Sequence, residues 1–267
     1  MTVRLGGGPA ISRLGFGARW LGANRETARA VLRRALELGV QLIDTAHAYA
    51  GSEEAIADAL YPYPDDVVIA TKGGQVVSGG AVSAAGRPEQ LRAACEESMQ
   101  RLRVETIDLY QLHMRDPEVP LEESLGALVD LRAEGKIREI GASNLLGPEL
   151  VKALELAPVA SVQNRFSFAA QETAGDIAEC ERRGVAFIPW APLSMGSLAS
   201  DSGRLAEVAS SHAATPAQVA IAWLLRRSPV IVAIPGTSSV DHLEQNVAAA
   251  TLVLSDDDVE RLAQSSA

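Results

Sequence analysis

Eight short runs rich in β-branched and aliphatic residues recur along this chain of 267 residues, and a longer segment separates each run from the next. Several of the runs, such as VVIATK at 67–72 and VIVAIPG at 230–236, are almost continuously apolar. Strands that are covered on both faces have this composition, which is typical of parallel sheets. The sequence therefore predicts strands at 13–18, 41–46, 67–72, 107–113, 137–143, 161–166, 185–191 and 231–236.

The segments between these runs have apolar residues at the spacing of a helix with one buried side. In the segment 25–38, for example, Ala28, Leu32 and Ala35 fall on one side of the predicted helix. The segments 88–102, 121–134 and 148–156 have a similar pattern. A proline stands near the start of each of these three, where its missing N–H costs little. We therefore expect a helical segment in every connection between strands.

Eight strand–helix units in a chain of this length are the size of a closed (β/α)8 barrel. A doubly wound open sheet shows the same alternation and is the competing architecture. That fold has a G-x-G-x-x-G turn after its first strand, whereas the sequence at 15–23 is GFGARWLGA, which matches poorly. No linker rich in Pro, Gly or Ser divides the chain. The sequence therefore predicts an α/β protein with a TIM-barrel fold, as a single domain over residues 1–267.

Composition excludes several classes of function. Lys and Arg number 24 against 34 Asp and Glu, and the formal net charge of −10 argues against binding to nucleic acid or to an anionic membrane. The N-terminus lacks the apolar region of a signal peptide, and no apolar stretch reaches the roughly 18 residues that span a bilayer. Cys95 and Cys180 cannot form a disulfide framework and lack metal-ligand spacing. We expect a cytoplasmic protein without a metal site.

Reactive side chains fall where the predicted strands end, and barrels build their active sites at that end. The second strand leads into LIDTAHAY with Asp44 and Tyr49, the third ends at Lys72, and the fourth ends at His113. Each residue alone also has a structural explanation, as a helix cap, a packed aromatic, a solvated charge or a core histidine. Four such groups at one end of neighbouring strands are costly unless they pair. We therefore interpret them together as a proton-transfer group.

The four residue types suggest a separate role for each residue in proton transfer. Asp44 would pair with Lys72 and hold it in place. As a nearby cation, Lys72 would favour the ionised form of the Tyr49 hydroxyl. His113 could orient a carbonyl oxygen or relay a proton.

The motifs of the chain closely resemble those of the aldo-keto reductases, in the same order and over nearly the whole length. The matching segments are GFGARW, LIDTAHAY, IATK, DLYQLH, GKIREIGASN, SVQNRFS, PWAPLSMG and IPGTSSVDHLEQN. The resemblance implies a (β/α)8 barrel that binds a nicotinamide dinucleotide without a Rossmann domain. It implies an oxidoreductase that reduces a small aldehyde or ketone to an alcohol with NADPH. It also implies the catalytic tetrad Asp44, Tyr49, Lys72 and His113.

The resemblance further implies which residues hold the cofactor. Ser143, Asn144 and Gln163 match the positions that bind the carboxamide. Trp190 matches the aromatic ring that stacks on the nicotinamide and so fixes which face offers its hydride. Further along the cofactor, the matching positions are Leu193, Ser194 and Gly196 as backbone donors around the pyrophosphate, and Gln245 and Asn246 at the adenine.

The eighth predicted strand departs from the family pattern. Many members bind the adenosine 2′-phosphate with a Lys and an Arg at the positions that are Gly236 and His242 here. The hydroxyls of Thr237 and Ser238, together with the N-terminus of the following helix, could still bind an anion. We expect NADPH as the cofactor, with NADH as the alternative.

Within the family, the segments ALYPYPDD at 59–66 and ATPAQVAIAWLLRRSP…IPGTSSVDHLEQN at 214–246 look most like the small bacterial pyridoxal reductases. This subgroup resemblance suggests pyridoxal as a substrate. Two other functions stay open at this point. One is a reductase-like barrel that senses the nicotinamide redox state for a protein partner, which would need an exposed apolar surface. The other is a phosphate-binding isomerase or lyase on the same barrel.

Overall fold

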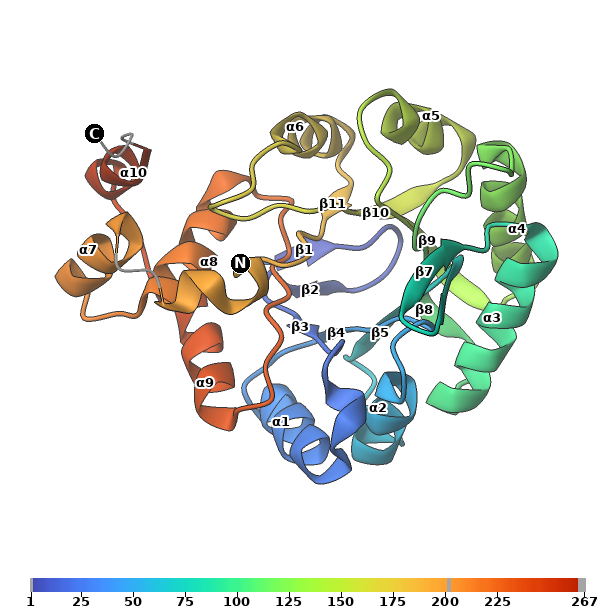
Figure 1. Ribbon diagram of the computed structural model, residues 1–267, viewed down its shortest axis with the longest axis horizontal. Coiled ribbons are helices and arrows are strands. Elements are labelled where there is room, and N and C mark those ends of the chain that lie inside the picture. Colours follow the sequence, from blue (N-terminus) through green and yellow to red (C-terminus); the bar gives the residue numbers. More distant parts are fainter. Residues whose placement is uncertain (1, 201–202, 264–267) are drawn as a thin grey trace.

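The computed structural model describes residues 2–200 and 203–263 and contains a parallel sheet of seven strands that curls into a barrel (Figure 1). Its strands are β3 (Phe16–Gly17), β4 (Leu42–Asp44), β5 (Val68–Gly73), β8 (Ile107–Leu112), β9 (Ile137–Ser143), β10 (Val159–Gln163) and β11 (Ala186–Phe187). They follow one another in space in the same order as in the sequence. The predicted (β/α)8 barrel is confirmed, and the open doubly wound sheet is not formed.

The eighth predicted strand closes the ring without forming a continuous ladder. Ile231 pairs with Phe187 of β11, and Ala233 pairs with Leu14, in two isolated parallel bridges. Pro235, two residues after Ala233, has no N–H to continue the pairing. The first and last strands of the sheet are thereby joined through this segment.

Helices surround the sheet, and α7 and α10 lie outside the ring beside α8 (Figure 1). They are α1 (Arg25–Glu37), α2 (Ser52–Leu60), α3 (Pro88–Leu102), α4 (Leu121–Ala133), α5 (Pro148–Leu156), α6 (Ala174–Arg183), α7 (Arg204–Ser211), α8 (Pro216–Arg227), α9 (Val240–Ala248) and α10 (Asp256–Ala263). Short 3₁₀ segments occur at Leu21–Ala23, Ser194–Ser200 and Ala249–Thr251. Within residues 2–200 and 203–263, no helix combines the length and the apolar character needed to cross a membrane.

Local sequence signals set the helix starts. The side chain of Asn24 accepts a hydrogen bond of 3.0 Å from Thr27 N at the start of α1. Thr215 and Gln218 cap each other's backbone N–H groups at the start of α8. Pro88 occupies the first turn of α3, as its sequence position predicts. Each of these signals fixes the residue at which a helix begins, and therefore where the preceding loop ends. The loops between the strands and these helices carry the site described below.

An antiparallel hairpin that the sequence pattern does not predict covers the N-terminal end of the barrel. It consists of β1 (Thr2–Arg4) and β2 (Ala10–Ser12). Leu5 and Ile11 of this hairpin are buried and pack in one cluster with Leu42, Leu109 and Val232 from the barrel interior. This end of the barrel is therefore filled by apolar side chains, which leaves the C-terminal end for chemistry.

A second hairpin, β6 (Gln75–Ser78) with β7 (Ala81–Ala84), follows β5 at the C-terminal end of the barrel. Gly79 and Gly80 form its turn with φ of 58° and 83°. Two consecutive residues in the left-handed region are what a type I′ turn requires, and glycine adopts that conformation without strain. The sequence pattern does not predict this hairpin either.

Candidate active site

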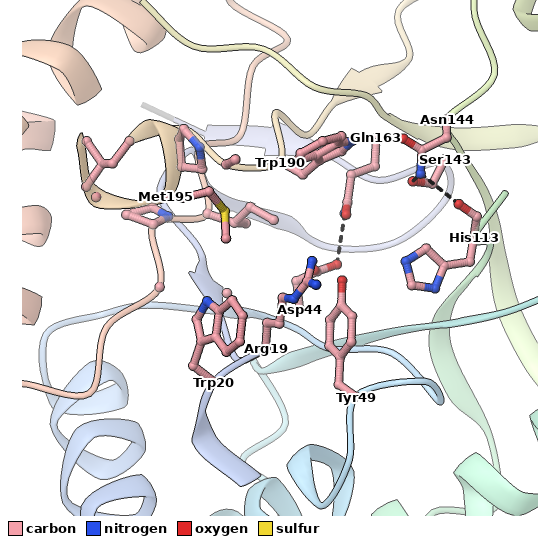
Figure 2. A pocket seen from close by; sticks show the side chains of 18 of the residues that line it. Arg19, Trp20, Asp44, Tyr49, His113, Ser143, Asn144, Gln163, Trp190 and Met195 are labelled. Atoms are coloured by element: carbon pink, nitrogen blue, oxygen red, sulfur yellow. Dashed lines mark hydrogen bonds between the residues drawn. The ribbon is translucent and has the colours of Figure 1, made fainter. Parts of the chain in front are cut away.

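A cavity of about 440 Å³ opens at the C-terminal ends of the strands (Figure 2). Asp44, Tyr49 and His113, three of the four predicted catalytic residues, line it. Of the predicted cofactor-binding residues, those that line it are Ser143, Asn144, Gln163, Trp190, Leu193, Gly196 and Gly236. Residues from most of the chain's length therefore meet at one place, as the strand ends predict.

Lys72, the fourth predicted catalytic residue, is fully buried and reaches the site through Asp44. Its Nζ lies 2.7 Å from Asp44 Oδ2 and donates a second hydrogen bond of 2.6 Å to Thr45 O. The same ammonium lies 5.4 Å from the centre of the Tyr49 ring. Lys72 therefore pairs with Asp44 and stands next to Tyr49, in the arrangement that the sequence predicts.

The other carboxylate oxygen of Asp44 is also satisfied. Asp44 Oδ1 accepts hydrogen bonds from Gln163 Nε2 at 2.9 Å and from Gln111 Nε2 at 3.2 Å. The sequence analysis does not include Gln111, which is fully buried. Its signal is its position two residues before His113 on β8, since alternate residues of a strand point to the same side. With these partners the buried carboxylate has no unmet acceptor and its position is fixed.

Tyr49 and His113 face one another across the cavity. Their ring centres are 5.7 Å apart and the ring planes are nearly perpendicular, at 81°. Burial lowers the pKa of His113 to about 2, and the positive charges of Lys72 and Arg19 act in the same direction. His113 is therefore a neutral imidazole at physiological pH, able to form hydrogen bonds but carrying no charge.

A hydrogen-bonded chain holds the far side of the cavity (Figure 2). Trp190 Nε1 donates to Asn144 Oδ1 at 3.0 Å, and Asn144 Nδ2 donates to His113 O at 2.9 Å and to Ser143 Oγ at 3.1 Å. Asn144 has a φ of 56°, a left-handed conformation that asparagine tolerates better than most residues. Both ends of the Asn144 amide are thus occupied in positioning Trp190 and His113.

Residues 13–267 match the aldo/keto reductase family. The chain belongs to that family.

Relatives support the assignment along the whole chain. An uncharacterised oxidoreductase of Schizosaccharomyces pombe is 40% identical over 95% of this chain and 86% of its own length. Pyridoxine 4-dehydrogenase of Escherichia coli is 37% identical over 94% of this chain and 93% of its own length. The crystal structure of an aldo-keto reductase from Klebsiella pneumoniae in complex with NADPH superposes with a TM-score of 0.87. That pair is 31% identical and covers 98% of this chain and 93% of the Klebsiella chain.

The loop that the sequence assigns to the pyrophosphate in this aldo-keto reductase is tightly turned. Ala191, Ser194, Met195 and Gly196 all have positive φ, between 48° and 96°. The N–H of Ser194 donates to Ala191 O and that of Gly196 donates to Leu193 O, both at 2.9 Å. Two of the three predicted backbone donors are therefore satisfied within the loop, and Ser194 does not line the cavity.

The residues predicted for the adenosine end of the cofactor lie apart from this cavity, except Gly236. His242 is exposed in the first turn of α9, and its N–H donates to the cap residue Ser239 at 3.3 Å. Gln245 is exposed and Asn246 is buried on the same helix. The other two members of the predicted set, Thr237 and Ser238, precede this helix. The structure thus gathers the predicted nicotinamide end in one cavity, while the residues predicted for the adenosine end, apart from Gly236, lie on α9 or just before it.

Gly236 stands where the family resemblance leads us to expect a lysine, and the backbone around it leaves no room for a side chain. A Cβ at Gly236 would lie 2.4 Å from Gly17 O, and a Cβ at Gly17 would lie 2.8 Å from Ile234 O. Real Cβ atoms do not approach backbone oxygens so closely. A lysine at this position therefore requires the two segments to move apart.

Two further lining residues, Arg19 and Gln75, have no role in the sequence analysis. Arg19 follows β3 by two residues, in the segment GFGARW. Gln75 begins the hairpin strand β6, which the sequence pattern does not predict. The signal for Arg19 was its place just beyond a strand end, the same criterion that identifies Lys72 and His113.

The thiols take no part in the site. Cys95 and Cys180 are both buried and unpaired with each other, and burial raises the pKa of each to about 12. Across residues 2–200 and 203–263, no group of His, Cys, Asp and Glu side chains is arranged to hold a metal ion.

Proposed function

We propose that this aldo-keto reductase reduces an aldehyde or ketone to an alcohol with NADPH, and that one barrel domain spanning residues 1–267 carries the activity. The observation that supports this most strongly is the convergence of Tyr49 and His113 on one cavity beside the buried Lys72–Asp44 pair. The Klebsiella relative that has a similar fold binds NADPH.

The nicotinamide end of the cofactor fits the cavity. No described residue donates a hydrogen bond to Gln163 Oε1, because only Nε2 of this amide is engaged, with Asp44. Gln163 Oε1 and Ser143 Oγ therefore remain to bind a carboxamide, and Trp190, held by Asn144, offers an indole face for stacking. When bound, NADPH supplies a hydride to the carbonyl carbon of the substrate.

We assign to Tyr49 the donation of a proton to the carbonyl oxygen. Negative charge develops on the carbonyl oxygen during reduction, and the Tyr49 hydroxyl donates a proton to it. The Lys72 ammonium, 5.4 Å from the Tyr49 ring, compensates the charge that remains on the tyrosine. Asp44 keeps Lys72 in that position.

We assign orientation of the carbonyl to His113. Its Nδ1 is buried and has no hydrogen-bond partner among the described residues. A buried N–H without an acceptor is rare in proteins, so the ring proton belongs on Nε2. The Nε2–H group then donates to the carbonyl oxygen that receives the proton from Tyr49.

The test is oxidation of NADPH, followed by its absorbance, with a set of small aldehydes and the variant Tyr49→Phe. We expect turnover by the unchanged protein and a fall in kcat of roughly 10²- to 10⁴-fold in the variant, the usual contribution of general acid catalysis. Binding of NADPH should be unaffected because the ring remains. Tyr61→Phe is the matched control, since Tyr61 is 55% exposed and lies outside the cavity. Equal kcat values for the two variants would contradict the assignment.

We infer pyridoxal as one substrate. The Escherichia coli relative is a pyridoxine 4-dehydrogenase, and pyridoxal is a flat aromatic aldehyde. Trp20, Tyr49 and Trp190 line the cavity and offer aromatic faces to such a ring.

The chemistry of the chain also supports a cytoplasmic protein that acts on small molecules and has no nucleic-acid partner. The net charge of −10 opposes binding to a phosphate backbone. Two buried free thiols suit a reducing compartment. Imaging of a fluorescent fusion in the source cell, together with a DNA-retention assay, tests both points.

A further inference from the structure

Arg19 extends over two aromatic rings at the mouth of the cavity (Figure 2). Its guanidinium carbon lies 4.9 Å from the centre of the Trp20 ring and 5.3 Å from the centre of the Tyr49 ring. Cation–π contacts of this kind use no hydrogen-bond donor, so the N–H groups of the guanidinium stay available for a ligand. Arg19 therefore presents a fork of hydrogen-bond donors next to the residue that donates the proton.

Nothing in the described part of the chain neutralises this arginine. Its side chain forms no ion pair and no hydrogen bond with any residue of 2–200 or 203–263, and its known contacts are the two rings. The other charges of the site balance, because Lys72 and Asp44 neutralise each other at 2.7 Å. His113 is uncharged, since its pKa is lowered to about 2. The cavity therefore has one uncompensated positive charge within a chain whose net charge is −10.

The backbone holds Arg19 firmly in this place. Ala18 N donates to Asp44 O at 2.8 Å, and Ala18 O accepts from Ser52 Oγ at 2.8 Å. Just beyond Arg19, Gly22 packs so closely that a Cβ there would lie 1.9 Å from Ala50 O. Anchors on both sides thus fix where this exposed side chain starts, and its guanidinium lies against the two rings.

We propose that Arg19 is a specificity-determining residue that binds a carboxylate on the carbonyl substrate, so that the preferred substrates are aldehydes or ketones bearing an acid group near the reacting carbon. The proposal rests on the carbonyl reduction proposed above. An arginine fork matches the two oxygens of a carboxylate, and such charge-assisted pairs are stronger than neutral hydrogen bonds. The contact with Tyr49 puts the positive charge at the reacting end of the cavity.

The experiment compares acidic aldehydes with neutral aldehydes of the same shape. The substrates are 3- and 4-carboxybenzaldehyde and their methyl esters, each measured as kcat/KM with NADPH. The variants are Arg19→Met, which removes the charge, and Arg19→Lys, which keeps the charge without the fork. Arg29→Met is the matched control because Arg29 is an exposed arginine on α1, away from the cavity, and its loss changes the net charge equally.

We expect the unchanged protein and Arg29→Met to prefer the acid over the ester. In Arg19→Met, kcat/KM for the acid should fall by roughly 10- to 100-fold, in the range of a hydrogen bond to a charged group, while kcat/KM for the ester changes by less than about 3-fold. For Arg19→Lys, kcat/KM for the acid should lie between the values of the unchanged protein and Arg19→Met. No preference for the acid in the unchanged protein would overturn the proposal.

Two other results would overturn it in a different way. An equal loss with acid and ester, together with weaker NADPH binding, would mean that Arg19 serves the phosphates of the cofactor. If no aldehyde is reduced at all, the proposed function fails, and calorimetry with benzoate and benzamide then decides the inference alone. In that case benzoate should bind the unchanged protein roughly 10-fold more tightly than Arg19→Met does, and benzamide equally to both. Equal binding of benzoate to both proteins would refute the anion site.

Discussion

Lys72 Nζ lies 2.7 Å from Asp44 Oδ2, and these side chains are only 0% and 5% exposed. Removing one member of such a buried pair leaves the other charge buried without its counter-ion. Thr45 O accepts a second hydrogen bond from Lys72, and Gln111 and Gln163 donate to the other oxygen of Asp44. The same contacts therefore hold the barrel strands β4 and β5 together and position the cation beside Tyr49.

This arrangement predicts that stability and activity separate in a double variant. Lys72→Met should lower the free energy of unfolding by about 3–5 kcal/mol and abolish most turnover. The double variant with Asp44→Asn and Lys72→Met should regain much of that stability, because no buried charge remains unpaired, but should stay inactive because the cation is absent. Urea unfolding followed by circular dichroism gives the first quantity and NADPH oxidation the second. A double variant as unstable as Lys72→Met would refute the prediction.

The lowered pKa of His113 predicts a loss of stability in mild acid. The folded protein holds this histidine neutral down to a pKa of about 2, whereas in the unfolded chain it takes up a proton near its ordinary value of 6.5. The unfolded state thus binds more protons between these values, so stability falls as pH decreases below 6.5 and is constant above it. The slope due to His113 is at most about 1.4 kcal/mol per pH unit.

The measurement is urea unfolding between pH 4 and 8 for the unchanged protein and His113→Asn. The difference between their free energies of unfolding should shrink as pH falls from 6.5 to 4 and stay level above 6.5. Other groups, such as Asp258 with its pKa lowered to about 2, titrate in both proteins and cancel. A difference that does not vary with pH would show that His113 is not held neutral.

Much of the barrel and of the catalytic group follows from the sequence because both depend on local signals. Apolar runs predict the strands, and the first reactive residues at their ends, such as Lys72 and His113, mark the C-terminal face. Parallel strands in one ring bring these ends together without further information. The same rule points to Arg19, whose role depends on two aromatic contacts that sequence spacing does not reveal.

The parts that the sequence does not predict depend on tertiary contacts. Gln111 reaches Asp44 from another strand, so its role needs the register of β8 against its neighbours. The loop of Ser194 and Gly196 bonds to its own carbonyls, a conformation that its composition does not specify. The segment around Ala233 is joined by bridges on both sides, and this closure is visible only once the ring forms.

His242 predicts how the cofactor preference can be strengthened. The family resemblance leads us to expect an arginine at this position, and here His242 is exposed at the start of α9, where a larger side chain has room. His242→Arg should tighten NADPH binding roughly 5- to 10-fold without changing NADH binding, because a guanidinium pairs with a phosphate that only NADPH carries. Fluorescence titration with each cofactor measures the two affinities. His242→Gln serves as the neutral control, and equal gains for NADPH and NADH would rule out a 2′-phosphate contact.

The aromatic lining of the cavity predicts the rank of pyridoxal among aldehydes. Trp20, Tyr49 and Trp190 offer flat faces to a ring, and Tyr49 with His113 would meet the aldehyde oxygen. Apolar contacts discriminate poorly between similar shapes, so benzaldehyde derivatives should also be reduced. Pyridoxal should nonetheless exceed short aliphatic aldehydes in kcat/KM under NADPH, since these leave the aromatic faces uncovered. Trp20→Ala should reduce this advantage, because Trp20 is 60% exposed and its loss removes one aromatic face, together with a contact of Arg19, without disturbing the core. If pyridoxal ranks at or below propanal, the inference of pyridoxal as a substrate fails while membership of the aldo-keto reductases is unaffected.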